Sequence, residues 1–194
     1  GTAVVVLAGI YGAMAAMGKS PGAITEQTFV VCGAGSAGMG IVNFIHAALV
    51  HHGLSPQQAF ERFYILDKHG LITSNRELKE GEPGVDDLRP FAESRRDLPD
   101  GINLREVIES AKPTALLGAS TVSGLFTHEI LTRMGELNKN PIIMPLSNPT
   151  SRAECTAEAA ANATEGRAIF SAGSPFDDVS RNGVTMVANQ GNNL

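Results

Sequence analysis

Apolar positions along the chain fall into short continuous runs, and segments with apolar residues at helical spacing separate most of these runs. Continuous runs predict buried strands, because a strand that is covered on both faces shows no polar alternation. They lie at residues 28–32, 63–67, 114–118, 141–146, 168–170 and 184–187. Helices are predicted at residues 36–52, 55–62, 103–111, 127–137 and 156–163. The alternation predicts an α/β, doubly wound fold, with a mainly parallel sheet and helices on both faces.

Two segments fit this alternation less simply. Residues 1–18 are almost uncharged and mostly apolar, but Gly9 and Gly12 interrupt them, and they fall short of the ~20 strongly apolar residues that a membrane span needs. We therefore expect a buried helix there, not a membrane or signal segment. Residues 71–99 are polar and rich in charge, Gly and Pro, which predicts a surface loop with one turn of helix near residues 90–93.

The first strand passes directly into a glycine-rich turn. Gly33, Gly35 and Gly38 stand in a Gly-x-Gly-x-x-Gly spacing at the start of a predicted helix. In a Rossmann-like dinucleotide-binding turn, the first glycine allows the tight turn, the second lets the backbone approach a pyrophosphate, and the third lets the helix pack closely. The pyrophosphate would sit on the positive end of the helix, near Ser36 and Ala37. A merely structural turn is the alternative.

Asp67 ends the second predicted strand, where a Rossmann fold binds the adenosine ribose hydroxyls. It lies farther from the glycine turn than the usual spacing of ~20 residues. The helix predicted at residues 55–62 accounts for the difference. The alternative is that Asp67 only caps a turn before residues 68–70.

Two later strands also end in Gly- or Asn-rich segments. Residues 118–124 include Ser120, and residues 146–150 include Asn148. Ligands of open parallel sheets bind beyond the carboxyl ends of the strands. Together with the glycine turn, these segments predict one binding site at that edge.

Composition and charge narrow the function classes. A length of 194 residues suits one domain with a sizeable core. A net charge of −5 without a basic run gives no footprint for nucleic acid or an anionic membrane. Cys32 and Cys155 have no metal-ligand spacing and form no disulfide framework, and adjacent His51 and His52 point to different faces, so we predict no metal site in this chain. The cysteine usage indicates a reducing compartment: the cytoplasm, with the mitochondrial matrix as the alternative.

Several of these motifs together resemble one family: the nucleotide-binding domain of malic enzymes, with malolactic enzymes as close relatives. The most specific match is Leu-Ser-Asn-Pro-Thr at residues 146–150 followed by Ala-Glu-Cys-Thr at residues 153–156. The other matching stretches are residues 1–9, 33–38, 67–71, 112–118, 166–177 and 190–193. They cover almost the whole chain in the family's order, which implies that residues 1–194 form an NAD(P)-binding domain.

The resemblance implies oxidative decarboxylation of malate to pyruvate and CO2, with reduction of NAD or NADP and a divalent Mg or Mn ion in the complete enzyme. It also implies a homo-oligomeric parent protein. The cofactor-binding residues that we assign are Thr2, near the phosphates, Gly33, Gly35, Ser36, Ala37, Gly38, Asp67, Ser120 and Asn148. The residues that the resemblance assigns to the substrate are Asn148, Asn192 and Asn193.

The departures from the family matter as much. The family's catalytic Tyr and Lys lie in an earlier domain, and its acidic metal ligands precede the position of Gly1; none of these is present here, and the resemblance stops short of the family's C-terminal segment. We therefore expect an excised cofactor domain that does not turn over malate alone. NADP-preferring animal members carry a Lys just before the position of Phe91, where this chain has Leu-Arg-Pro. That favours NAD, although Lys68 and Arg76 are available for a 2′-phosphate.

Three alternatives remain open from the sequence. A malolactic enzyme uses the same fold and NAD but releases lactate. A non-catalytic nucleotide-sensing or assembly module would keep this domain without the chemistry. A generic dehydrogenase of this fold is the weakest, because it leaves residues 146–156 unexplained.

Overall fold

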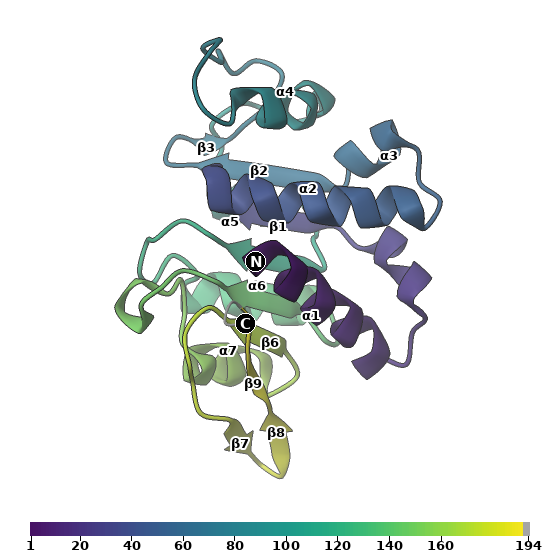
Figure 1. Ribbon diagram of the computed structural model, residues 1–194. Helices are drawn as coiled ribbons and strands as arrows, with labels where there is room; N and C mark the ends of the chain where they lie inside the picture. The colour runs from purple at the N-terminus through teal and green to yellow at the C-terminus, as the bar shows by residue number, and fades with distance from the viewer. Residues whose placement is uncertain (192–194) are drawn as a thin grey trace.

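The computed structural model describes residues 1–191, in which a seven-stranded sheet is flanked by helices (Figure 1). Its strand order is β3-β2-β1-β4-β5-β6-β9. The strands are β1 (Phe29–Cys32), β2 (Phe63–Asp67), β3 (Gly70–Leu71), β4 (Ala115–Gly118), β5 (Ile142–Pro145), β6 (Ile169–Ala172) and β9 (Ala188–Gln190). All neighbouring strands pair in parallel except β3, which is antiparallel to β2. The predicted mainly parallel sheet is confirmed.

The helices divide between the two faces of the sheet. They are α1 (Thr2–Ala16), η1 (Pro21–Glu26), α2 (Ser36–His51), α3 (Pro56–Phe60), α4 (Val85–Ser94), α5 (Leu104–Ala111), α6 (His128–Leu137), η2 (Thr150–Arg152) and α7 (Ala157–Thr164). One core cluster joins α1 to α4 to the sheet, and a second joins α5, α6 and α7 to its other face. Successive strand residues alternate between the clusters: Val30 and Leu116 belong to one, Val31 and Leu117 to the other. Helices on both faces, as predicted, are confirmed.

The chain reverses its direction across the sheet next to β1. From β1 it moves outward to β2 and β3, then crosses back to β4 on the other side of β1 and continues through β5 and β6 to β9. The loops after β1 and β4 therefore diverge at the carboxyl edge. An open α/β sheet binds ligands in the crevice at such a switch point.

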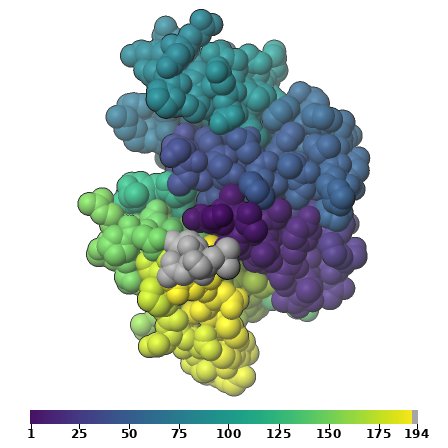
Figure 2. All heavy atoms as spheres, viewed as in Figure 1, coloured from purple at the N-terminus to yellow at the C-terminus, as the bar shows by residue number. Residues whose placement is uncertain are grey.

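Helix α1 confirms the helix predicted at residues 1–18, although only one of its sides is buried. Val6, Ile10 and Met14 are fully buried, whereas Val4 on the outer side is 48% exposed. Because α1 leads through η1 to the start of β1, its N-terminus is directed toward the carboxyl edge of the sheet. Figure 2 shows this purple end of α1 on the viewed face, between the blue of α2 and the green and yellow of the C-terminal half. No helix among residues 1–191 is long and apolar enough to cross a membrane.

The single helical turn expected near residues 90–93 is wrong in extent, because α4 covers ten residues. Phe91 is 3% exposed, and its ring lies 4.9 Å from the ring of Phe60 and 5.3 Å from that of Phe63, centroid to centroid. Burying a Phe side chain stabilises a fold by about 1.5–3 kcal/mol, which offsets the backbone hydrogen bond that Pro90 removes. The tertiary contact outweighs the local signal of Pro and charge.

The strand predicted at residues 184–187 is confirmed, but it lies outside the main sheet and is mostly exposed. Strand β8 (Val184–Met186) pairs with β7 (Val179–Arg181) in a separate antiparallel hairpin, and β9 completes the main sheet beside β6. Asn182 and Gly183 connect β7 to β8 with φ of 49° and 80°. Two residues with positive φ match the turn that favours a tight hairpin, and Asn-Gly is its common sequence.

Candidate functional site

Backbone hydrogen bonds continue past the ends of the strands and hold the following loops side by side. The amide of Gly33 donates to Leu66 O at 2.8 Å, and the amide of Ala119 donates to Cys32 O at 2.7 Å. The amide of Leu146 donates to Gly118 O at 2.8 Å. The structure thus brings together the three segments that the sequence singled out at this edge: the glycine turn and the loops after β4 and β5.

The three glycines of the turn differ in what surrounds them. A Cβ on Gly33, whose φ is +118°, would overlap the carbonyl group of Ala119, and a Cβ on Gly38 would overlap the carbonyl group of Gly33. A Cβ on Gly35 would meet no protein atom within 4 Å, apart from its chain neighbours. The fold therefore requires Gly33 and Gly38, whereas internal packing gives no reason for glycine at position 35.

Gly35 is the N-cap of α2, a helix of 16 residues that carries no side-chain cap and no acidic residue in its first turn. Gly35, Ser36 and Ala37 are exposed. The first amides of a helix have no partner within the helix, and they carry a partial positive charge that attracts anions. This end of α2 has the exposed backbone that a bound phosphate group needs.

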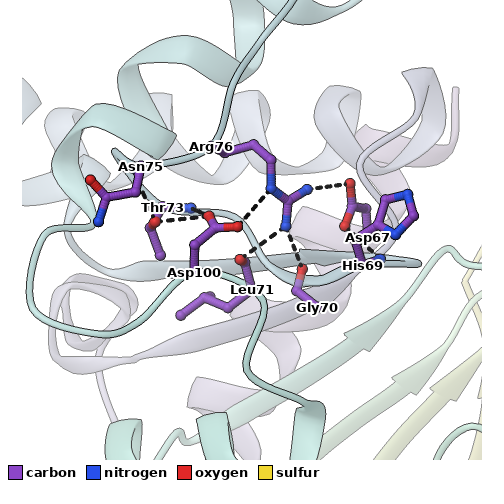
Figure 3. Close-up of polar contacts among 8 residues, drawn as sticks. All are labelled: Asp67, His69, Gly70, Leu71, Thr73, Asn75, Arg76 and Asp100. Carbon is purple, nitrogen blue, oxygen red and sulfur yellow. Dashed lines mark hydrogen bonds and ion pairs between the residues drawn. The ribbon is translucent and has the colours of Figure 1, made fainter.

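Asp67, at the end of β2, is held by two interactions (Figure 3). Its Oδ1 accepts from the amide of His69 at 2.9 Å, and its Oδ2 accepts from Nη1 of Arg76 at 2.7 Å. Asp67 therefore does cap the turn at residues 68–70, which was the alternative role that the sequence left open. This role does not conflict with a ribose contact, since each carboxylate oxygen has two lone pairs and the side chain is 31% exposed.

Arg76 joins Asp67 to a second carboxylate, that of Asp100. Its Nε donates to Asp100 Oδ2 at 2.9 Å, while Nη2 donates to the carbonyl oxygen of Leu71 at 3.1 Å (Figure 3). Burial raises the pKa of the Asp100 carboxyl, but hydrogen bonds from Arg76 and Thr73 outweigh it and hold this pKa below its usual value. One guanidinium between two carboxylates leaves this cluster with a formal charge of −1, and the Arg76 side chain is 15% exposed.

Glu154 connects the loops after β4 and β5. It is fully buried, and its Oε2 accepts from the amide and Oγ of Ser120 at 2.9 and 2.6 Å and from Oγ of Ser147 at 2.7 Å. Its Oε1 accepts from the amide of Ser147 at 3.3 Å. Burial, with the charge of Glu154 adding to it, raises the pKa of the thiols of Cys32 and Cys155 above its usual value, so both are kept as neutral packing groups.

The remaining predicted site residues lie as follows. Asn148 is exposed after β5, and its Oδ1 accepts from Oγ of Ser174 at 2.9 Å. Ser120 is half-buried, and Glu154 occupies both its amide and its hydroxyl. Thr2 begins α1 at the helix end that is directed toward this edge. Asn192 and Asn193 lie outside the described residues.

A hollow in the described surface lies away from this edge. The hollow, of about 340 Å³, lies between α5 and α6, where Arg105, His128 and Arg133 contribute to its lining. It has no glycine turn, and Arg133 is paired there with Glu109 at 2.6 Å.

Within residues 1–191, no three His, Cys, Asp or Glu side chains are grouped so that they could hold a metal ion.

Comparison with known proteins decides between the families that share this architecture. A family model described as "Malic enzyme, NAD binding domain" matches residues 1–194. The chain belongs to the malic enzyme NAD-binding domain family. Its resemblance to that family, inferred from the motifs, is thereby confirmed.

Curated relatives include both malic and malolactic enzymes. Over the whole of this chain, identity is 40% to the mitochondrial NAD-dependent malic enzyme of Ascaris suum, 43% to the malolactic enzyme of Leuconostoc mesenteroides and 41% to the NADP-dependent malic enzyme of Anas platyrhynchos. The chain covers 28%, 35% and 33% of these proteins, or about a third of their length. This malic enzyme domain therefore has relatives that use either nucleotide.

A solved structure assigned as a malic enzyme (malate oxidoreductase) has the same fold. It superposes on 98% of this chain with a TM-score of 0.66 at 25% identity, and the match covers 41% of that protein. The malic enzyme of Entamoeba histolytica, at 24% identity, gives a TM-score of 0.67 over 89% of this chain and 31% of its own. Both likenesses support the Rossmann-like fold.

Sequence reasoning missed three residues that organise this edge: Asp100, Ser147 and Glu154. Asp100 lies 33 positions beyond Asp67, in a stretch expected to be loop, so nothing local links the two. Glu154 belongs to the Ala-Glu-Cys-Thr motif, but the sequence alone assigned no role to its carboxylate. Its flanking apolar residues, Ala153 and Cys155, were the available sign of burial.

The contrast between glycines generates the first prediction. Gly35→Ala should lower the free energy of unfolding by at most about 1 kcal/mol, the cost of alanine at an N-cap, but it should strongly weaken binding of NAD, because its Cβ enters the space that a pyrophosphate would take. Gly38→Ala, the matched control, should destabilise the fold by more than about 1 kcal/mol. Urea unfolding followed by circular dichroism and calorimetric titration with NAD measure the two effects. A stable Gly35→Ala variant that binds NAD like the wild type would contradict the assignment.

Proposed function

We propose that this chain is the nucleotide-binding domain, over residues 1–194, of an enzyme that oxidises and decarboxylates malate to pyruvate and CO2 with reduction of NAD. The observation that carries the proposal is Gly35: it has no packing reason to be glycine, and it caps α2 at the switch point of a malic enzyme NAD-binding domain. A small residue there is explained by a ligand that approaches the backbone closely.

We assign the two halves of the nucleotide to the two sides of the switch point. The pyrophosphate lies on the N-terminal turn of α2, and the adenosine ribose lies beside Asp67. The residues assigned to the phosphates are Thr2, Gly33, Gly35, Ser36, Ala37 and Gly38. The nicotinamide half then extends toward the loops after β4 and β5, which carry Ser120 and Asn148.

When bound, the nucleotide would supply a hydride acceptor for C2 of malate, and the residues of this chain would bind and orient the two reactants. Ser174 occupies Oδ1 of Asn148, so the Nδ2 group of that amide is the donor available to a substrate carboxylate or to the nicotinamide amide. We assign substrate binding to Asn148, Asn192 and Asn193. The catalytic Tyr and Lys and the ligands of a Mg or Mn ion would come from parts of the parent protein outside this chain.

The cluster around Asp67 supports NAD as the preferred nucleotide. A 2′-phosphate would meet the carboxylate of Asp67. Of the two cations available for it, Arg76 is already paired with Asp67 at 2.7 Å and with Asp100 at 2.9 Å, and Lys68 is exposed. Like charges repel, and a guanidinium between two carboxylates has little attraction left for a third anion. The 2′- and 3′-hydroxyls of NAD can instead donate to Asp67.

This arrangement predicts the selectivity. The Kd for NADP should exceed the Kd for NAD by at least about tenfold, and Asp67→Asn should narrow that ratio because it removes the repelling charge and releases Nη1 of Arg76. Asp97→Asn is the matched control, since Asp97 is 58% exposed and pairs with Arg95 instead. Calorimetric titration of the three proteins with each nucleotide measures the ratio. An Asp67→Asn ratio equal to that of the wild type would count against the role of Asp67.

Product analysis tests the proposed reaction. The natural protein that carries this chain, supplied with malate, NAD and Mg or Mn, should form pyruvate and NADH, whereas the isolated chain should form neither. The malolactic alternative is favoured by the 43% identity to the Leuconostoc mesenteroides enzyme and would give lactate without net NADH. Absence of any product from the natural protein would favour a non-catalytic nucleotide-binding module. Turnover by the isolated chain would contradict the proposed division of labour.

We further propose that the parent protein is a homo-oligomer in the cytoplasm or the mitochondrial matrix. Val4 on α1 and Phe44 on α2 are 48% and 45% exposed on helices that pack against each other, and they offer apolar area to further protein. One relative, the Ascaris suum enzyme, is mitochondrial. The sequence has no basic run that would attract nucleic acid or an anionic membrane, and neither partner is part of this proposal.

A further inference from the structure

Glu154 is a buried anion whose partners are all neutral donors. It is 0% exposed and forms no ion pair among residues 1–191. Four hydrogen bonds surround its carboxylate, two from Ser120 and two from Ser147. A buried charge is tolerated only when hydrogen bonds replace the water that it lost. The burial of Glu154 therefore requires the donors of the two loops, and the conformation of the two loops requires the carboxylate that accepts from them.

The backbone at the end of β4 is built to admit this side chain. A Cβ on Gly118 would overlap the side chain of Glu154, so glycine at that position gives the carboxylate its place. The backbone of residues 153–154 also holds the C-terminal end of the loop between β4 and α6. The amides of Gly124 and Phe126 donate to the carbonyl oxygens of Ala153 and Glu154 at 3.3 and 3.0 Å. Both ends of the loop are thus fastened to one short segment.

The two serine hydroxyls pass this constraint on to the exposed part of the loop. Oγ of Ser147 donates to Glu154 and accepts from the amide of Thr121 at 2.9 Å, and Oγ of Ser120 donates to Glu154 and accepts from the amide of Val122 at 3.1 Å. Thr121 has a φ of +59°, which is rare for a β-branched residue and persists only where the surroundings impose it. Strained backbone of this kind concentrates at ligand-binding sites.

We propose that Glu154 is a positioning residue for the nicotinamide half of the nucleotide site. Its carboxylate fixes the loop after β4 and the loop after β5 relative to each other, and so sets the place of Asn148, the residue that follows Ser147. This inference rests on the proposed function, which places the nicotinamide half over these two loops. Among residues 1–191, Asp67, which we assign to the adenosine ribose, shares no hydrogen bond with Glu154 or with its partners Ser120 and Ser147.

Comparing a whole nucleotide with its adenosine half separates positioning from a general loss of structure. The purified chain is titrated with NAD and with ADP, which carries the adenosine and pyrophosphate groups only. Glu154→Gln keeps the size of the side chain but turns one acceptor oxygen into an NH2 donor that faces the donors of the loops. The loops must then be ordered at the moment of binding, so the ratio of the Kd for NAD to the Kd for ADP should rise about tenfold, with the Kd for ADP unchanged.

Two further variants make the result decisive. Ser147→Ala removes two hydrogen bonds of the same network, those that join the Ser147 hydroxyl to Glu154 and to the amide of Thr121. It should also raise the ratio of the two Kd values. This variant tests the positioning role if Glu154→Gln does not fold. Thr164→Val is the control. Thr164 is equally buried, and its hydroxyl donates to Ala160 O and accepts from the amide of Ala168, both outside the two loops, so this variant should leave the ratio unchanged.

The outcomes that overturn the assignment are distinct from those that overturn the proposed function. An unchanged ratio in Glu154→Gln and Ser147→Ala, or an equal rise in Thr164→Val, would overturn the positioning role while nucleotide binding stands. A wild-type chain that binds neither NAD nor ADP would overturn the proposed function itself, and this assignment with it.

Discussion

Parallel pairing of β1 with β2 and β4 is the constraint on which the rest of the structure depends. The register aligns Cys32 with Leu66 on one side and with Gly118 on the other, so three strands end at the same edge. Because the chain reverses direction beside β1, the helices that follow β1 and β4 leave toward opposite faces and open a crevice at that edge. The site residues come from distant parts of the sequence, and this register is what brings them together.

At this edge the site is organised by charge. The N-terminal turn of α2 offers a partial positive charge and unpartnered amides, and the Asp67–Arg76–Asp100 cluster has a formal charge of −1. The buried carboxylate of Glu154 accepts hydrogen bonds from neutral donors only. The N-terminal turn of α2 suits an anionic pyrophosphate, and the Asp67–Arg76–Asp100 cluster suits ribose hydroxyls. We propose that this difference in charge along the edge directs the nucleotide from adenosine beside β2 to nicotinamide beside β5.

Local sequence was enough to predict the elements whose signals are local. Continuous apolar runs identified the central strands, and the capping residues Ser55, Asn103, Thr127 and Thr156 accept the hydrogen bonds that begin their helices. The full length of α4 could not be predicted, because the packing of Phe91 on Phe60 and Phe63 is a tertiary effect that overrides Pro90. The β7–β8 hairpin was predictable in principle, since Asn182-Gly183 is a hairpin signal that apolar patterning alone overlooks.

The candidate site also combines residues with local sequence signals and contacts that only the tertiary structure creates. The glycine turn and Asp67 could be proposed from the sequence, because the apolar pattern marks the strand that the turn follows and the strand that Asp67 ends. The pairing of Arg76 with Asp67, and the contacts of Glu154 with Ser120 and Ser147, join residues from different loops. Such contacts exist only after the sheet has set its register, so no local pattern encodes them.

The central claim is that the carboxyl edge of β1, β2, β4 and β5 binds the nucleotide, and mapping amide chemical shifts tests it most directly. A ¹⁵N-labelled sample of the chain titrated with NAD should show shifts concentrated in residues 33–38, 67–70, 118–122 and 146–148. The amides of the β7–β8 hairpin and of the hollow between α5 and α6 should stay unmoved. Shifts centred on that hollow, or no shifts at a saturating nucleotide concentration, would contradict the account.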